Sequence, residues 1–265
     1  MLGVPYDAHS SFMRGPAAAP AAIRAALTSG SANWCTEDGL DLDPAVNDDW
    51  VDLGDVAVPD DAPTAVAAIS AAATDALADG SGLLSLGGDH MVTWPLVRAV
   101  TDRVDGLTIV HFDAHPDLYD SLDGDRYSHA CPFARIMEDG KVARLIQLGI
   151  RTMNPHQRAQ ADRFGVDVHE LRDWDGTVPS LTGPVYVTVD LDALDPAFAP
   201  GVSHHEPGGM TTRQLLDAIR QIRASGAPVV GADVVELNPT RDVNEVTAMV
   251  AAKVVRELLG VLIRR

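Results

Sequence analysis

Cysteine is scarce in this chain. The two cysteines, Cys35 and Cys131, lie far apart in the 265 residues and match neither a zinc-binding nor a redox spacing. The sequence therefore predicts no cysteine-based metal site and no dithiol chemistry. Both residues are expected to be ordinary thiols, and Cys131 at most lines a site.

Long apolar runs are also missing. No stretch approaches the roughly 20 apolar residues that a membrane-spanning helix needs, so no membrane partner is expected. The first six residues have neither a basic region nor a long apolar segment ahead of a cleavage site. That pattern predicts no secretory signal, and a cytoplasmic location is the expectation.

Basic residues are few. The chain has 20 Lys and Arg against 38 Asp and Glu, which gives a formal net charge of -18. Such a charge disfavours binding to phosphate backbones and to anionic membranes, so no nucleic-acid partner is expected. It would draw cationic small molecules toward a cleft, although an excess of acidic residues also simply serves solubility.

The periodicity of apolar residues indicates an α/β fold. Strands are predicted at residues 2–5, 50–58, 83–86, 108–112, 145–149, 166–169, 185–189 and 229–235, and helices at 15–27, 63–78, 95–101, 133–139, 155–164, 211–225 and 247–263. Alternation of strands and helices at this spacing favours crossover connections and a parallel sheet. Because no internal repeat or low-complexity linker interrupts the chain, we expect one domain over residues 1–265.

Four of the predicted strands run directly into residues of types that can bind metals. Residues 83–88 precede Asp89 and His90, 107–112 precede Asp113, His115 and Asp117, 185–189 precede Asp190 and Asp192, and 229–235 precede Glu236. Parallel α/β sheets bind ligands outside the carboxyl ends of their strands. Carboxylates beside buried strands also need a counter-charge, because otherwise they lose hydration without compensation. The pattern predicts a hydrolase site with two metal ions.

The types of these residues favour manganese. Two imidazoles and four carboxylates form an oxygen-rich set, which suits Mn²⁺ better than Zn²⁺. Four carboxylates balance two divalent ions, and such ions make a hydroxide nucleophile available at neutral pH. If residues 113–117 and 190–192 stay extended, alternate side chains in each segment point to one side. A lone Asp-x-Asp is more typical of a loop turn, so the prediction depends on the combination.

Several motifs in this order resemble those of the ureohydrolase superfamily, the arginases and agmatinases. They are Gly87–His90, Asp113–Asp117, Tyr127–Phe133, Val189–Pro196, Ala199–Gly209 and Gly231–Pro239. Together they span nearly the whole chain and are most similar to plant-type arginases and their bacterial relatives. The resemblance implies a three-layer α/β/α domain with a mainly parallel central sheet and a metal site at the carboxyl ends of the strands.

The resemblance also implies roles for individual residues. One of two Mn²⁺ ions per subunit would be held by His90, Asp113, Asp117 and Asp190, and the other by Asp113, His115, Asp190 and Asp192. His129 matches the histidine that shuttles protons in the family, and Glu236 matches the carboxylate that pairs with the guanidinium group of the substrate. Because relatives form trimers or hexamers, a homo-oligomer is expected.

The implied reaction is hydrolysis of a cationic guanidino compound to urea and an amine. Residues 119–128 resemble the corresponding segment of plant-type arginases, which favours L-arginine, hydrolysed to L-ornithine, as the substrate. Agmatine or another ω-guanidino acid is the alternative. A non-catalytic metal-binding paralogue is a further alternative, but such a protein should have lost a ligand, the shuttle histidine or the guanidinium-pairing acid, and none is lost here.

The loop after the third cluster departs from the Thr-Gly-Thr-Pro type of many agmatinases and animal arginases. It contains His204, His205 and Glu206 instead. Adjacent residues on an extended loop face opposite ways, so at most one of the two histidines is expected to reach the site. Glu206 either contacts an amine of the substrate or accepts hydrogen bonds from loop amides.

Overall fold

A seven-stranded parallel sheet forms the centre of the computed structural model, which describes residues 1–263. The strands are β1 (Leu2–Gly3), β2 (Leu83–Leu86), β3 (Leu107–Phe112), β4 (Val142–Ile150), β5 (Asp167–Glu170), β6 (Val185–Asp190) and β7 (Val229–Val235). Their order across the sheet is β1-β2-β7-β6-β3-β4-β5, and every ladder is parallel. The predicted α/β class and the parallel sheet are confirmed.

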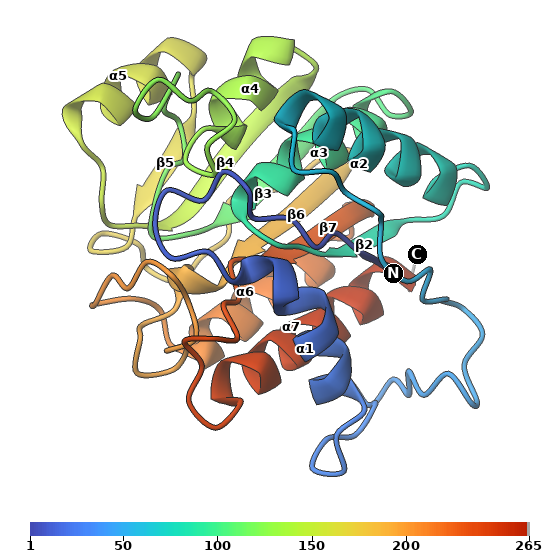
Figure 1. The fold of residues 1–265 in the computed structure, drawn as a ribbon. Helices are drawn as coiled ribbons and strands as arrows, with labels where there is room; N and C mark the ends of the chain where they lie inside the picture. The colour runs from blue at the N-terminus through green and yellow to red at the C-terminus, as the bar shows by residue number, and fades with distance from the viewer. Residues whose placement is uncertain (264–265) are drawn as a thin grey trace.

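Helices cover both faces of the sheet (Figure 1). One face carries α1 (Ala19–Leu27), α6 (Thr212–Ala224) and α7 (Val246–Ile263), and the other carries α2 (Ala62–Ala76), α3 (Thr93–Thr101), α4 (Pro132–Asp139) and α5 (Pro155–Phe164). Within residues 1–263, short 3-10 turns are also present at η1 (Pro16–Ala18), η2 (His90–Val92) and η3 (Leu191–Ala193). The result is the expected three-layer arrangement.

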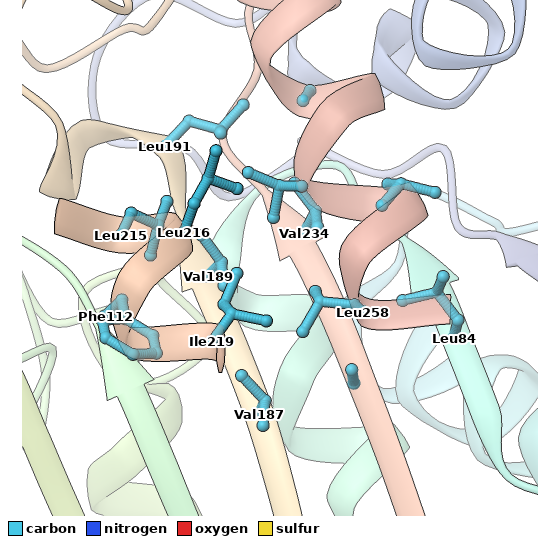
Figure 2. Packing of buried hydrophobic residues seen from close by; sticks show 14 of the residues in the cluster. Leu84, Phe112, Val187, Val189, Leu191, Leu215, Leu216, Ile219, Val234 and Leu258 are labelled. Carbon is cyan, nitrogen blue, oxygen red and sulfur yellow. The ribbon is translucent and has the colours of Figure 1, made fainter. Parts of the chain in front are cut away.

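The hydrophobic core consists of two layers, one on each side of the sheet. On one side, Figure 2 shows side chains of the central strands packed against α6 and α7, among them Phe112, Val187, Val189, Val234, Leu215, Leu216, Ile219 and Leu258. Every residue of β2, β3 and β6 is buried. Strands covered on both faces need continuous apolar runs, and this is why these segments are easy to find in the sequence.

The prediction of a strand at residues 50–58 is wrong. The segment forms no ladder, and its pairing with β1 amounts to one bridge between Gly3 and Asp55 with a few backbone hydrogen bonds to Met1 and Gly3. Val51 and Leu53 are 62% and 51% exposed. Aspartate and glycine are disfavoured in strands, and the neighbouring β1 is only two residues long, so the segment has little edge to pair with. The other predicted elements are present, with ends that differ by a few residues.

The four strands that carry the predicted site are neighbours at the centre of the sheet, in the order β2-β7-β6-β3. The chain leaves β2 through Gly88, where the Cβ of any other residue would lie 1.8 Å from the backbone oxygen of Tyr6. Only glycine permits this approach. It brings the N-terminal loop across the carboxyl end of β2, where Asp89 N donates to Tyr6 O at 2.8 Å.

Among residues 1–263, no helix combines the length and the apolar character that crossing a bilayer requires.

Candidate active site

The predicted site residues lie at or just beyond the carboxyl ends of their strands. His90 begins η2 after β2, Asp113 follows β3 directly, Asp190 ends β6, and Glu236 follows β7. These side chains are almost entirely buried. The sheet order therefore brings together groups that are up to 146 positions apart, such as His90 N and Glu236 Oε1, which are 3.0 Å apart.

Around His90, one imidazole nitrogen faces three carboxylates. Its Nδ1 lies 3.1 Å from Asp113 Oδ2, 3.1 Å from Asp117 Oδ2 and 3.2 Å from Asp190 Oδ2. This buried Nδ1 forms no hydrogen bond with the described residues. The other ring nitrogen, Nε2, lies 3.1 Å from Thr188 Oγ1. Three carboxylate oxygens therefore converge on Nδ1 without a hydrogen bond to it, an arrangement that suits a cation between them.

Asp113 connects this group to a second one. While Oδ2 faces His90, Oδ1 lies 3.4 Å from His115 Nδ1, which in turn lies 3.0 Å from Asp192 Oδ2. Ligand atoms of Asp113, His115 and Asp192 all lie within 4.8 Å of one another. A carboxylate that presents one oxygen to each group has the geometry of a bridging ligand.

The ligand segments are not extended, so strand-like alternation of side chains does not apply to them. Asp192 lies in the 3-10 turn η3, and Asp117 has a φ of 50°. In both segments the first aspartate accepts a hydrogen bond from the amide two residues later, Asp113 Oδ1 from His115 N at 2.6 Å and Asp190 Oδ1 from Asp192 N at 2.7 Å. These local turns gather the ligands instead.

The pKa values of the predicted ligands show that this group holds an excess of negative charge. Burial, together with the nearby Asp192 and Asp113 carboxylates, raises the pKa of Asp190 well above its usual range. Burial also raises the pKa of Asp192, to about 6. Burial would lower the pKa of His90, but the carboxylates of Asp113, Asp117 and Asp190 outweigh it and raise that pKa well above normal. Bound cations would relieve this repulsion, since they are the largest charges in such sites.

Separations of about 3 Å between ligand atoms are those expected around an octahedral ion about 2.1 Å from each ligand. Oxygen-dominated sets with imidazole suit Mn²⁺ among the common divalent metals. The unpartnered His90 Nδ1, the two faces of Asp113 and the crowded carboxylates fit a pair of divalent cations.

A second layer behind Asp113 was not predicted from the sequence. His111 Nε2 donates to Asp113 Oδ2 at 2.7 Å, and Gln147 Nε2 donates to His111 Nδ1 at 3.0 Å and to Pro116 O at 2.6 Å. The His111 ring also stacks on Phe133, with centroids 3.9 Å apart. Although His111 lies near enough to join a metal group with His90 and Asp113, both its nitrogens are already bonded. It therefore orients Asp113, as partners of metal ligands commonly do.

His129 and Glu236 form a buried pair beside the ligands. His129 Nδ1 lies 2.8 Å from Glu236 Oε1, and His129 Nε2 lies 2.8 Å from Ser11 Oγ. Burial would lower the pKa of His129, but Glu236 outweighs it and raises the pKa to about 9, so His129 carries a proton at neutral pH. Burial would raise the pKa of Glu236, but His129 outweighs it and lowers the pKa. Glu236 adopts a φ of 66°, a strained value typical of functional positions.

The N-terminal loop adds contacts that sequence reasoning missed. Besides Ser11 on His129, Ser10 Oγ donates to Asp89 Oδ2 at 3.1 Å. Asp89 is fully buried, and burial together with the charge of Glu236 raises its pKa to about 8. Serines in an N-terminal loop give no signal by themselves, because only the fold brings residues 11 and 129 together.

The two adjacent histidines of the later loop do diverge. His204 faces the site, with its ring 5.0 Å from that of His129, 6.0 Å from that of His115 and 5.6 Å from that of Phe12. His205 is exposed, and its Nε2 bonds to Pro200 O at 2.6 Å. The expectation that at most one histidine reaches the site is confirmed. The Glu206 side chain does not line the cavity, while its backbone oxygen accepts hydrogen bonds from Arg151.

A cavity of about 220 Å³ opens onto these groups. The predicted site residues on its wall are His115, Asp117, His129, Asp190, Asp192 and Glu236, and neutral or neighbouring residues complete it: Ser11, Tyr119, Leu122, Ala130, Thr152, Gln157 and His204. His90 and Asp113 lie behind this wall, fully buried. A space of this volume suits a small molecule.

Comparison with known proteins gives a consistent result. The model of the Arginase family matches residues 1–260. The chain is 47% identical to Arginase 1, mitochondrial, of Arabidopsis thaliana, over 97% of this chain and 79% of that protein. It is 34% identical to an agmatinase of Bacillus anthracis, over 98% of this chain and 90% of that protein. The solved arginase from Medicago truncatula superposes with a TM-score of 0.89 at 43% identity, covering 97% and 85% of the two chains.

Proposed function

The chain belongs to the arginase family, and from that premise we propose that it hydrolyses a guanidino compound to urea and an amine, with L-arginine as the substrate and L-ornithine as the amine product. The observation that carries the proposal is that Asp113 faces both His90 and His115, beside the buried pair of His129 and Glu236. The same groups suit agmatine, which remains the alternative because the relatives include agmatinases.

Two Mn²⁺ ions are proposed as the cofactor. His90, Asp113, Asp117 and Asp190 would hold one ion, and Asp113, His115, Asp190 and Asp192 the other. When bound, such ions lower the pKa of a water molecule enough for it to act as a nucleophile at neutral pH. His111 and Gln147 keep Asp113 in place for this purpose.

Glu236 orients the substrate. Its Oε1 is occupied by His90 N and His129 Nδ1, whereas its Oε2 has no hydrogen-bond partner within residues 1–263. Oε2 is therefore available for a charge-assisted bond to the guanidinium group. Such a bond holds the planar carbon beside the ligand groups, so that water attacks one face of it.

His129 supplies the proton for the departing amine. Water adds to the guanidinium carbon, and the bond from this carbon to the alkyl nitrogen then breaks, so this nitrogen needs a proton. Glu236 raises the pKa of His129 to about 9 and bonds to its Nδ1, so the proton that His129 can pass on is the one at Nε2, which lies 2.8 Å from Ser11 Oγ. A positioned acid of this kind contributes about 10²- to 10⁴-fold to a rate.

Further properties belong to the proposal. We propose one catalytic domain over residues 1–265, a homo-oligomer, and a cytoplasmic location, although the plant relative named above is called mitochondrial. The acidic chain and its small cavity support a cationic small molecule as the substrate, and not a nucleic acid.

The test is to load the protein with Mn²⁺ and to measure urea released from L-arginine, from agmatine and from 4-guanidinobutyrate. We expect urea from L-arginine at the highest kcat/KM. The His129→Ala variant should bind the same amount of manganese and lose about 10²-fold or more of kcat. If the fully loaded wild-type protein releases no urea from any of the three compounds, the proposal is wrong.

A further inference from the structure

The neutral part of the cavity wall has a chemical character of its own. Tyr119, Thr152 and Gln157 line it, and they come from the loop after the β3 ligands, from the segment after β4 and from α5. The charged groups on the wall have the tasks described above, while these neutral groups face whatever the guanidinium is attached to. The hydrogen bonds that they can donate or accept therefore decide which group the substrate can carry at the end opposite the guanidinium.

Gln157 presents hydrogen-bond donors to the cavity. Its side chain is nearly inaccessible, with the residue 3% exposed, and its Oε1 accepts a hydrogen bond from Leu118 N at 3.1 Å. The Nε2 group has no hydrogen-bond partner within residues 1–263. Nε2 is not among the buried atoms that lack a partner, so its two N–H groups open onto the cavity, where a ligand can accept from them.

Tyr119 also presents a donor. Its hydroxyl oxygen accepts a hydrogen bond from Asn154 Nδ2, and its ring stacks on His156 with centroids 5.4 Å apart and planes 14° apart. The O–H of Tyr119 has no acceptor within the described part of the chain. Since Asn154 also caps the N-terminus of α5, the hydroxyl is held by the same turn that positions Gln157.

The third neutral group differs from these two. Thr152 Oγ1 donates to Ala114 O at 3.0 Å and keeps lone pairs that can accept, whereas the groups still free on Gln157 and Tyr119 are donors. The distal ammonium of agmatine has no acceptor, so it would leave the N–H groups of Gln157 and the O–H group of Tyr119 unpaired. A carboxylate would satisfy both donors, with the added strength of bonds to a charged group.

We propose that Gln157 and Tyr119 bind the carboxylate of the substrate and thereby select a guanidino acid over agmatine. This inference rests on the proposed function, because it names the residues that would choose among guanidino compounds at the same site. Neither residue takes part in breaking the carbon–nitrogen bond.

Gln157→Glu tests the proposal with almost no change in shape. The new side chain can still accept from Leu118 N, but it offers a negative charge in place of two donors. We expect kcat/KM for L-arginine and for 4-guanidinobutyrate to fall about 10²-fold, and kcat/KM for agmatine to stay constant or rise. Tyr119→Phe keeps the stacked ring and should reduce the ratio of L-arginine to agmatine about 10-fold.

Gln160→Glu is the matched control. Gln160 is another buried glutamine of α5 outside the cavity wall, and Arg163 lies 3.2 Å from its Oε1, so a new charge there has a partner. Its Nε2 donates to Leu118 O at 3.3 Å and not into the cavity, so this variant loses a donor without changing the cavity wall. The ratio of L-arginine to agmatine should stay within about 2-fold of the wild-type value. This variant separates the loss of local donors from a general effect of added negative charge.

Binding of the products gives a second readout that does not need turnover. By calorimetry, L-ornithine should bind the manganese-loaded protein more tightly than putrescine, and Gln157→Glu and Tyr119→Phe should remove most of this preference. If both variants change all substrates and products by a common factor, or leave the carboxylate-bearing compounds unaffected, the inference is wrong. If Gln157→Glu does not fold, Tyr119→Phe decides alone. If the wild type binds L-ornithine selectively but releases no urea, the proposed function fails and this inference stands.

Discussion

The charged and the neutral parts of the cavity wall are built in different ways. The charged part comes from residues that directly follow four neighbouring strands, and each ligand lies within five residues of a strand end. The neutral part comes from α5, from the loop at residues 118–122, from the segment after β4 with Thr152 and from the N-terminal loop. The sheet fixes the groups that would hold cations, while the connecting segments and α5 determine what else fits. This division agrees with the general rule that a scaffold positions chemistry and loops adapt it.

Replacing a shared ligand should break the charged part completely. In Asp113→Asn, one side chain loses the charge that faces both His90 and His115. We expect manganese affinity and kcat/KM to fall by more than about 10²-fold, because even loss of a partner of a ligand costs up to that much. Metal content by elemental analysis and urea release measure the two effects. Normal manganese content in this variant would contradict the bridging geometry.

The pair of His129 and Glu236 should make stability depend on pH. The folded-state pKa of His129, about 9, lies above the usual value of about 6.5, so the stabilisation is complete below pH 6.5 and is lost as pH rises through 9. In metal-free protein, urea unfolding at pH 6.5 should show that His129→Asn lowers the free energy of unfolding by on the order of 3 kcal/mol. At pH 10 the difference should largely vanish.

The exposed His156 provides the control for this experiment. His156→Asn should change the free energy of unfolding little and by a similar amount at both pH values. A difference between wild type and His129→Asn that stays constant from pH 6.5 to pH 10 would show that the charged pair does not contribute as described.

A smaller effect is expected from the second layer. Gln147→Met removes the donor that fixes the tautomer of His111, so His111 no longer reliably donates to Asp113. Manganese affinity measured by calorimetry should fall about 10- to 100-fold. Gln160→Met, at a buried glutamine whose Nε2 bonds to Leu118 O and not to a ligand side chain or its partner, should leave the affinity unchanged. Equal manganese affinities in wild type and Gln147→Met would show that His111 and Gln147 only pack behind Asp113 and do not affect metal binding.

The smallest expected effect on kcat/KM is the difference between replacing His204 and replacing His205, two neighbours on one loop. His204→Ala removes a ring from the cavity wall and should lower kcat/KM, whereas His205→Ala removes an exposed side chain and should change it by less than about 2-fold. Parallel urea assays of the two variants measure the contrast. Equal losses in both would mean that the loop acts through its backbone instead.

The sequence by itself determined the class of fold and the charged part of the site. Strands buried on both faces appear as continuous apolar runs, and ligands placed directly after them remain visible as short motifs such as Asp113–Asp117. The strand predicted at residues 50–58 is absent, because pairing there depends on the length of the neighbouring β1. Local composition does not contain that information.

Only the tertiary structure decided the rest. Ser11 on His129, Gln147 behind His111 and the free amide of Gln157 all depend on contacts between segments that are distant in sequence or on bonds that already occupy one atom of a side chain. A sequence shows which residues can donate or accept, but the donors and acceptors that stay free are known only once the chain has folded and satisfied the others.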